Sequence, residues 1–232
     1  DTLTYVTNFS VPVGWRSQYC GLFKAEHDGV TYYFIDNEYY FKRSGLYGFY
    51  DDGERFAFFS RAILETLFYT DFEPDIINCN DWQTALVPIY LKDDSVREER
   101  FRSIRTVLSI HNIEYQGRYG AECMGDLFGL DRGWVDDGTL LLDGDLNLLK
   151  GAILTADAVN AVSPTYAQEL KNPYFAHRME GILTQCGYKL SGVLNGIDMK
   201  LYDPAADGRI TANYTAEDLS GKAADKTALQ NL

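Results

Sequence analysis

The run Thr106-Val107-Leu108-Ser109-Ile110 leads directly into the polar pair His111-Asn112. Three further short apolar runs end in the same way, in Asn80-Asp81, Ser163-Pro164 and Asn195-Gly196. In a sheet of parallel strands separated by helices, the carboxyl ends of the strands open into one crevice, and ligands bind there. The pattern therefore predicts one rim that carries a carboxylate, an imidazole and two side-chain amides.

Strand-like and helical patterns alternate along the rest of the chain. Asp28-Gly29 predicts a tight hairpin turn, and the aromatic, glycine-rich residues 37–48 predict a loop. Strands are expected at about residues 19–25, 30–36, 75–78, 104–110, 158–162 and 190–194, and helices at about 54–69, 83–91, 147–157, 180–186 and 221–232. The buried stripe of the first helix is expected to comprise Phe56, Phe59, Ile63 and Leu67. The alternation predicts an α/β fold with a doubly wound, mostly parallel sheet.

Length and charge restrict the class of protein. The 232 residues, 46% of them hydrophobic, suffice for one large α/β domain or for one domain with a small appendage. The net charge of −13 disfavours nucleic acid as a partner, whereas a neutral glycan meets no such repulsion. The chain begins at Asp1 rather than Met, which suggests an excerpt or a processed product, and no apolar run has membrane-spanning length. We expect a soluble protein without a membrane partner.

Cofactor and metal motifs are not found in the sequence. The four cysteines lie far apart, without Cys-x-x-Cys, which predicts free thiols in a reducing compartment. His-x-His, a P-loop, Gly-x-Gly-x-x-Gly and Gly-x-Ser-x-Gly are also missing. We therefore predict neither a metal site nor a cofactor.

Asp81 and His111 are the strongest candidates for residues that bind substrate or take part in catalysis. A carboxylate at a strand end can accept a hydrogen bond from a sugar hydroxyl, although Asp81 could equally cap the following helix. Trp82 could shield that carboxylate or anchor the turn. His111 could orient or protonate a substrate oxygen, and the alternative is a structural histidine. His27 and His177 are assigned to the surface.

Two further segments could contact a ligand. Tyr39, Tyr40 and Tyr47 lie in the predicted aromatic loop, where their rings could stack on sugar or simply pack the loop. After the last predicted strand, Gly196 could adopt left-handed geometry and let the backbone approach a ligand, or it could form an ordinary turn. The pattern leaves both alternatives open.

Blocks spread through nearly the whole chain resemble bacterial glycogen synthases and plant starch synthases. They are Val11-Pro12-Val13-Gly14-Trp15, Tyr32-Tyr33-Phe34-Ile35-Asp36-Asn37, Asn80-Asp81-Trp82-Gln83, His111-Asn112-Ile113-Glu114-Tyr115-Gln116-Gly117, Ser163-Pro164-Thr165-Tyr166 and Leu194-Asn195-Gly196-Ile197-Asp198. The resemblance implies a GT-B enzyme with two Rossmann-like domains, which transfers glucose from ADP-glucose to the non-reducing end of an α-1,4-glucan with retention. It also implies cytoplasmic localisation in a bacterium, or a plastid in a plant.

Within that family the chain corresponds to the N-terminal, acceptor-side half. Residues 1–204 would form this domain without its first strand and loop, and residues 205–232 would form the linker and the start of an interdomain helix. The second domain would be lacking, so we expect the fragment alone to be inactive. An exposed sheet edge would favour self-association.

The resemblance also assigns site residues. Asp81 and His111 would be catalytic, and Tyr47, Asn112 and Asn195 would bind substrate. The partners would be an α-1,4-glucan acceptor, such as glycogen or a maltooligosaccharide, and ADP-glucose in the intact enzyme. Two alternatives remain: a stand-alone glucan-binding module, and a hydrolase that pairs Asp81 with Glu114 as its two carboxylates.

Overall fold

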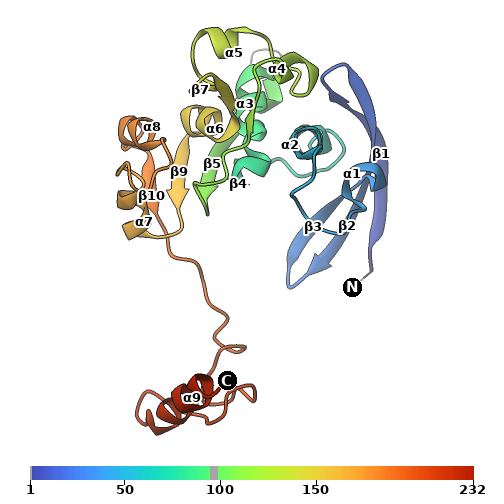
Figure 1. Cartoon of the computed structure of the whole chain (residues 1–232). Helices are drawn as coiled ribbons and strands as arrows, with labels where there is room; N and C mark the ends of the chain where they lie inside the picture. The colour runs from blue at the N-terminus through green and yellow to red at the C-terminus, as the bar shows by residue number, and fades with distance from the viewer. Residues whose placement is uncertain (1, 95–98) are drawn as a thin grey trace. The chain divides into compact units, whose positions relative to one another are not determined.

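Four parallel strands form the central sheet of the first of two units in the chain (Figure 1). The structure is a computed structural model that describes residues 2–94 and 99–232. The strands lie in the order β10-β9-β5-β4, and their bounds are β4 (Ile76–Asn80), β5 (Arg105–Ile110), β9 (Ala158–Ala161) and β10 (Leu190–Gly192). Helices follow these strands in the sequence, so the predicted parallel α/β sheet is confirmed.

Several helices of this unit lie along the chain between the parallel strands or next to them, and those starting near residues 83, 147 and 180 agree with the predicted positions. They are the short 3-10 turn η1 (Trp82–Thr84), α3 (Leu86–Asp94), α6 (Leu148–Thr155), α7 (Pro164–Glu169) and α8 (Glu180–Gln185), with a second 3-10 turn η2 (Glu99–Phe101) before β5. The side chain of Ser163 caps α7 by accepting a hydrogen bond from the Tyr166 N–H at 2.8 Å, and Pro164 occupies the first turn. Because proline lacks the N–H that would be unpaired there, this start costs the helix little.

A separate antiparallel sheet contains β1 (Thr4–Val13), β2 (Arg16–His27) and β3 (Val30–Asp36). Asp28 and Gly29 both have positive φ, 49° and 76°, as the predicted tight hairpin requires. Strand β1 was not predicted from the sequence. Its inward residues Phe9, Val11 and Val13 alternate with more exposed ones, which is the signature of a strand with one buried face.

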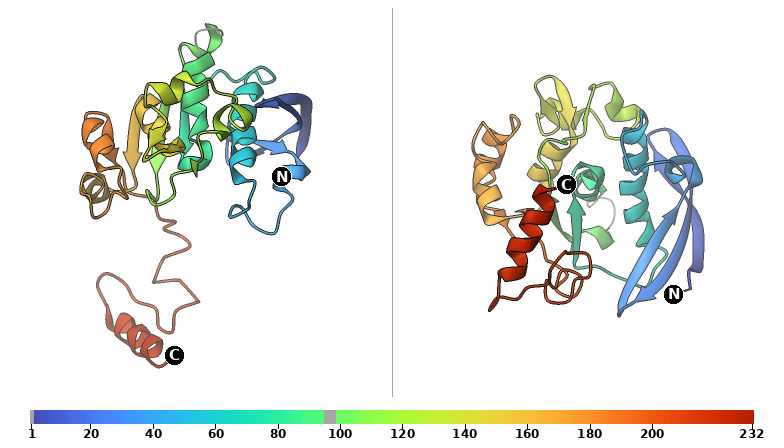
Figure 2. Two further views of the ribbon diagram at one scale, coloured as in Figure 1. Left: turned by 45° about the horizontal axis from the view of Figure 1, so that its top comes forward. Right: turned by 60° about the horizontal axis from the view of Figure 1, so that its bottom comes forward.

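Helix α2 (Asp52–Thr66) lies between the antiparallel sheet and α3, as Figures 1 and 2 show. Both of its sides are covered, and its fully buried residues include Phe58, Ser60 and Ala62. The predicted single stripe was therefore wrong in part: Leu67 is buried, but the other three members are only half-buried. The predicted loop also contains a short helix, α1 (Glu38–Phe41), which Asn37 caps by accepting a hydrogen bond from the Tyr40 N–H.

The glycine-rich segment after β5 forms small elements rather than a long coil. They are β6 (Arg118–Tyr119), α4 (Cys123–Asp126), α5 (Gly133–Asp136), β7 (Leu141–Leu142) and β8 (Asp145–Asn147), and the three strands form a sheet in the order β6-β8-β7. Gly117 has a φ of 63°, and a Cβ at this position would lie 2.7 Å from the Trp82 ring. Glycine therefore lets this segment pass directly over Trp82.

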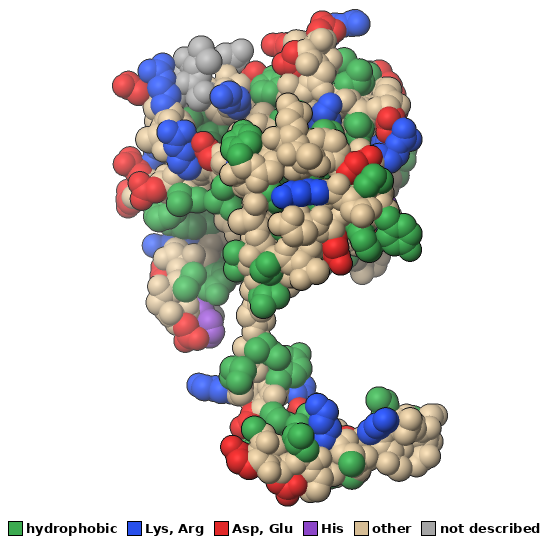
Figure 3. Space-filling model, turned by 90° about the vertical axis from the view of Figure 1, so that its left-hand side faces the viewer, with side chains coloured by type: hydrophobic (Ala, Val, Ile, Leu, Met, Phe, Trp, Pro, Cys, Tyr) green, Lys and Arg blue, Asp and Glu red, His purple; other side chains and the backbone are tan. Residues whose placement is uncertain are grey.

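All four cysteines are free thiols, as predicted. On the face shown in Figure 3, acidic side chains are interspersed with basic ones rather than gathered in one patch. Across residues 2–94 and 99–232, no helix is both long enough and apolar enough to cross a membrane.

The second unit comprises Leu194–Leu232 and carries helix α9 (Ser220–Gln230). Near the start of this unit the chain turns at Asp198. The Asp198 carboxylate accepts hydrogen bonds from the N–H groups of Lys200 and Leu201, both at 2.9 Å. Gly196 does not have a positive φ. Of the two alternatives for this glycine, the left-handed one is therefore not observed, and the chain turns at Asp198 instead.

Candidate active site

Three of the polar strand ends lie side by side. The strand β5 pairs with β4 through Ser109 and Asn80 and with β9 through Ile110 and Ala161. The residues at or just after the ends of these strands, namely 80–81, 111–112 and 163–164, therefore share one edge of the sheet, here called the strand-end edge. The sequence predicted this juxtaposition.

Asp81 holds the turn that follows β5. Its Oδ1 accepts hydrogen bonds from the N–H groups of His111 at 2.7 Å and Asn112 at 3.4 Å. It makes no side-chain cap to the following turn, so the helix-cap alternative was wrong. Within the described residues, its Oδ2 has no protein partner. One carboxylate oxygen is thus structural and the other is available to a ligand.

The backbone of Asp81 is itself unusual, with φ 53° and ψ −165°. This region is populated almost only by glycine, and a side chain there costs about 1–3 kcal/mol. Such strain is tolerated where the side chain is needed, and here the carboxylate spans two strand ends.

His111 is exposed and its ring is oriented by a neighbouring strand end. The Nε2 atom lies 3.0 Å from Asn80 Oδ1. In a neutral imidazole with this acceptor, Nε2 carries the hydrogen and Nδ1 is the acceptor. A substrate hydroxyl can therefore donate to Nδ1.

Helix α7, which follows β9, also supports the His111 turn. The Tyr166 hydroxyl accepts a hydrogen bond from the Ile113 N–H at 3.0 Å. Burial raises the pKa of Tyr166, and the charges of Asp81 and Glu169 add to this effect. The sequence analysis assigned no role to Tyr166 or to the Asn80 side chain, although Tyr166 ends the Ser-Pro-Thr-Tyr block.

Beneath the edge, a buried amide pair fixes the following residues. Gln116 Nε2 donates to the carbonyls of Ile113 at 3.1 Å and His177 at 3.0 Å. Its Oε1 accepts a hydrogen bond from Asn147 Nδ2 at 2.6 Å. His177 is exposed and takes part only through its backbone, and His27 is exposed as well, so both surface assignments are confirmed.

Trp82 anchors the turn and does not face a ligand. It is 9% exposed and packs edge-on against Phe56, with ring centroids 5.0 Å apart. The Tyr119 ring packs against Trp82 in a tilted orientation, with the ring centroids 6.2 Å apart. Of the two interpretations of Trp82, the structure supports the anchoring one.

Tyr47 lies in an exposed segment, residues 42–51, here called the Tyr47 loop, and is itself exposed. Tyr39 is exposed too, whereas Tyr40 is fully buried and cannot meet a sugar. No hydrogen bond or ring contact within the described part of the chain joins Tyr47 to the strand-end edge.

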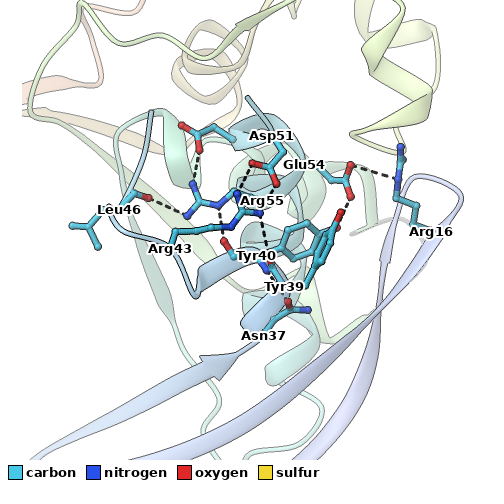
Figure 4. A network of polar contacts seen from close by, with 10 residues as sticks. Arg16, Asn37, Tyr39, Tyr40, Arg43, Leu46, Asp51, Glu54 and Arg55 are labelled. Atoms are coloured by element: carbon cyan, nitrogen blue, oxygen red, sulfur yellow. Dashed lines mark hydrogen bonds and ion pairs between the residues drawn. The ribbon is translucent and has the colours of Figure 1, made fainter. Parts of the chain in front are cut away.

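Two arginines hold the Tyr47 loop, as Figure 4 shows. Arg55 is 2% exposed and donates to the carbonyls of Tyr40 at 2.7 Å and Leu46 at 3.2 Å, and it pairs with Asp52. Arg43 forms two hydrogen bonds with Asp51, at 3.2 and 2.7 Å. Neither arginine was predicted from the sequence to have a role.

Asn195 belongs to the second unit and is exposed. Its role in substrate binding stays a prediction. In the part of the chain that the structure describes, no group of three or more His, Cys, Asp or Glu side chains could hold a metal ion.

An α/β domain with polar side chains at the ends of adjacent parallel strands belongs to the Rossmann-like class, which binds ligands at that edge. Residues 1–185 match the family described as the starch synthase catalytic domain. The chain belongs to this family.

Curated relatives agree with this assignment. The chain is 52% identical over 228 residues to a glycogen synthase of Ligilactobacillus salivarius, covering 98% of this chain and 48% of that protein. It is 46% identical over 229 residues to a glycogen synthase of Clostridium acetobutylicum, with the same two shares. The chain thus spans about half the length of the curated relatives it matches.

A solved structure extends the agreement to three dimensions. The catalytic domain of starch synthase IV from Arabidopsis thaliana, bound to ADP and acarbose, matches with a TM-score of 0.83 and 33% identity. The match covers 99% of this chain and 48% of that one. The resemblance noted in the sequence and the predicted fold class are both confirmed.

Proposed function

We propose that this chain is the acceptor-side part of an enzyme that transfers glucose from ADP-glucose to the non-reducing end of an α-1,4-glucan, with retention. The observation that carries the proposal is the strand-end edge, where Asp81 Oδ2 and His111 Nδ1 are both free to meet a sugar. The names of the relatives, and the ADP and acarbose bound to the starch synthase IV domain, support the choice of substrates.

The chemistry at this edge is mainly positioning. Asp81 Oδ2 accepts a hydrogen bond from a sugar hydroxyl, and His111 Nδ1 accepts another. Asn112 already uses its Oδ1 to accept a hydrogen bond from the Glu114 N–H at 3.0 Å, so its amide group serves as a donor. Fixing a reacting hydroxyl in this way can contribute up to about 7–11 kcal/mol in ideal cases. We assign no covalent nucleophile.

Two further side chains are proposed to contact substrate, Tyr47 in the first unit and Asn195 in the second. The exposed Tyr47 ring stacks on the apolar face of a glucose unit, and Asn195 supplies an amide to the sugar. With a net charge of −13, the protein suits a neutral glucan better than nucleic acid. The higher identity to bacterial relatives, 52% against 33% for the plant domain, favours the bacterial cytoplasm over a plastid.

We also propose self-association through β4. This strand is the last in the order of the parallel sheet, and Ile76 on it is exposed. A hollow of about 330 Å³ beside it is lined mainly by apolar side chains, including Ile35, Ile63 and Phe72. An unpaired strand edge next to apolar surface is a template for pairing with a second copy. A monomer on size-exclusion chromatography with light scattering would contradict this, and Ile76→Lys should abolish any dimer.

The test of the enzyme proposal is transfer of radiolabelled glucose from ADP-glucose to glycogen. It is measured for residues 1–232 alone and for the full-length product of the gene that encodes them. We expect transfer only by the full-length product, and at least about 100-fold less with His111→Asn. His27→Asn, an exposed histidine in the hairpin, is the matched control. Transfer by residues 1–232 alone, or full activity of His111→Asn, would contradict the proposal.

A further inference from the structure

A second hollow, separate from the one beside β4, lies between the turn of the β1–β2 hairpin, the start of α2 and α4. Its volume is about 480 Å³, and its lining includes Arg16, Tyr50, Glu54, Tyr119 and Asp126. This size falls in the usual range of sites for small ligands. None of these residues belongs to the strand-end edge.

The charged groups of the hollow are fixed in place by hydrogen bonds. Arg16 donates to the Asp126 carbonyl at 2.8 Å and to its carboxylate at 3.3 Å, and it lies 3.5 Å from Glu54. The buried Tyr40 donates to the other oxygen of Glu54 at 2.6 Å, as Figure 4 shows. Hydrogen bonds from Trp15 and Arg16 lower the pKa of Asp126. Arg16 is therefore held where it can donate hydrogen bonds to a ligand, and the Glu54 and Asp126 carboxylates are held where they can accept them.

Exposed aromatic rings stand beside these polar groups. Trp15 is 78% exposed, yet its Nε1 donates to Asp126 at 2.6 Å. Arg16 covers one face of the Trp15 ring, 4.7 Å from the centroid, which leaves the other face open. Tyr50 is fully exposed. The Trp15 indole is thus exposed to solvent and fixed in orientation, and its open face can stack on a flat apolar surface of a ligand.

Tyr119 forms part of the wall and reaches back toward the strand-end edge. Its ring packs against Trp82, the residue after Asp81. Gly53 makes room for it, since a Cβ there would lie 2.7 Å from the Tyr119 ring. Among the described residues the Tyr119 hydroxyl has no hydrogen-bond partner, so this polar atom is available to a ligand.

The balance of charges selects the kind of ligand. Arg16 faces the carboxylates of Glu54 and Asp126, so a phosphate or carboxylate ligand would meet net repulsion. A neutral polyhydroxyl ligand can donate to the two carboxylates, accept from Arg16 and stack on the open face of Trp15. We infer that this hollow is a second saccharide site, which binds glucose units of an α-glucan away from the strand-end edge. The choice of α-glucan among saccharides rests on the proposed function.

The test uses maltoheptaose and two readouts on the protein. The first is the dissociation constant, measured by calorimetry for the wild type and for Trp15→Ala and Tyr50→Ala. Both side chains are exposed, so neither change threatens the fold. Tyr174→Ala, which removes a tyrosine that is 84% exposed elsewhere, is the matched control. We expect about three- to tenfold weaker binding for the two variants and no change for the control.

The second readout is quenching of tryptophan fluorescence by acrylamide. Trp15 is exposed, whereas Trp82 is buried and Trp134 is partly buried, so most quenching reports on Trp15. Maltoheptaose should reduce quenching in the wild type and equally in Asp81→Ala, because the second site does not use Asp81. Wild-type affinity in Trp15→Ala and Tyr50→Ala, or unchanged quenching at saturation, would overturn the inference.

The outcomes also separate this inference from the proposed function. Binding that depends on Asp81 and Tyr47 but not on Trp15 and Tyr50 would overturn the second site and keep the proposed one. The reverse pattern would keep the second site and remove support for the strand-end edge as the acceptor site. A folded protein that binds no maltoheptaose would contradict both.

Discussion

The strand-end edge and the Tyr47 loop both present side chains to a proposed sugar ligand, yet they are held in opposite ways. At the edge, the turn after β5 donates backbone hydrogen bonds to a neighbour on each side, from the His111 N–H to Asp81 and from the Ile113 N–H to Tyr166. The Tyr47 loop has no helix or strand of its own and depends on Arg55 and Arg43. The side chains at the sheet edge are therefore positioned by many backbone and side-chain contacts, whereas those of the loop depend on a few residues.

The largest effect should therefore come from the loop. Replacing Arg55 with Met leaves Asp52 and two carbonyl groups without their buried cationic partner, which should cost about 3–5 kcal/mol of unfolding free energy. Urea denaturation followed by circular dichroism measures this loss. Arg43→Met is the matched control, because its pair with Asp51 is partly exposed and should be worth at most about 1 kcal/mol. Equal losses in the two variants would break the comparison.

The next largest effect on stability is expected at Asp81. Two substitutions there distinguish the contribution of backbone strain from that of the hydrogen bonds. Asp81→Ala loses the charged acceptor of two N–H groups, worth about 1.5–3 kcal/mol, and keeps the unfavourable φ of 53°. Asp81→Gly loses the same bonds but relieves about 1–3 kcal/mol of strain, so its stability should lie close to that of the wild type. Thermal unfolding distinguishes the two variants.

The control for this pair is Asp28, which has a φ of 49° in an exposed hairpin turn. Asp28→Gly should be neutral or slightly stabilising, because no strand end depends on its carboxylate. If Asp81→Gly were as unstable as Asp81→Ala, strain at Asp81 would play no part.

Tyr166→Phe should have a smaller effect on the edge. The Ile113 N–H loses its acceptor, at a cost of about 1 kcal/mol, while Asp81 still holds His111. Hydrogen exchange at the Ile113 amide should become faster with the turn otherwise intact. Collapse of the whole turn in this variant would show that the edge depends on single residues as much as the loop does.

The smallest effects concern the reactivity of the thiols. Burial raises the pKa of Cys79, which lies on β4 beneath the edge, to about 12, and raises that of Cys20 to about 12 with help from Asp36. Cys123, which lines the second hollow, is less buried. Iodoacetamide at pH 8 should therefore modify Cys123 before Cys79 and Cys20, as mass spectrometry of the digest would show.

The same pKa shifts predict the direction of a pH effect on stability. Above the ordinary thiol pKa of 9.0, Cys79 and Cys20 ionise in the unfolded chain but stay protonated in the fold up to about 12. Ionisation thus favours unfolding, and stability falls as the pH rises from about 9 to 12. Cys79→Ala should lessen that fall. An unchanged slope in the variant would contradict the assignment.

Much of the parallel sheet could be predicted from the sequence, because each strand is a short apolar run that ends in a polar pair. Ile76 to Asn80 and Arg105 to Ile110 are clear examples. Strand β1 was missed although Phe9, Val11 and Val13 alternate with exposed residues. The single stripe predicted for α2 failed because two separate layers cover this helix, which its own sequence cannot reveal.

The candidate site, like the fold, has features that the sequence predicts and features that it does not. Adjacent strand ends follow from topology, so Asp81 and His111 could be placed together in advance. The hydrogen bonds from His111 to Asn80 and from Ile113 to Tyr166 depend on side-chain geometry and join residues that lie 31 and 53 positions apart in the sequence. Arg55 looked like an ordinary helical arginine, since nothing local reveals that it reaches the carbonyls of the preceding loop.

The most direct test of the central claim is native affinity electrophoresis of the folded protein with and without glycogen in the gel. We expect retardation of the wild type, at least about tenfold weaker affinity for Asp81→Ala, and a smaller loss for Tyr47→Ala. Asp28→Ala and Tyr174→Ala should migrate like the wild type. Folded Asp81→Ala that is retarded as strongly as the wild type would contradict the assignment of the strand-end edge as the glucan site.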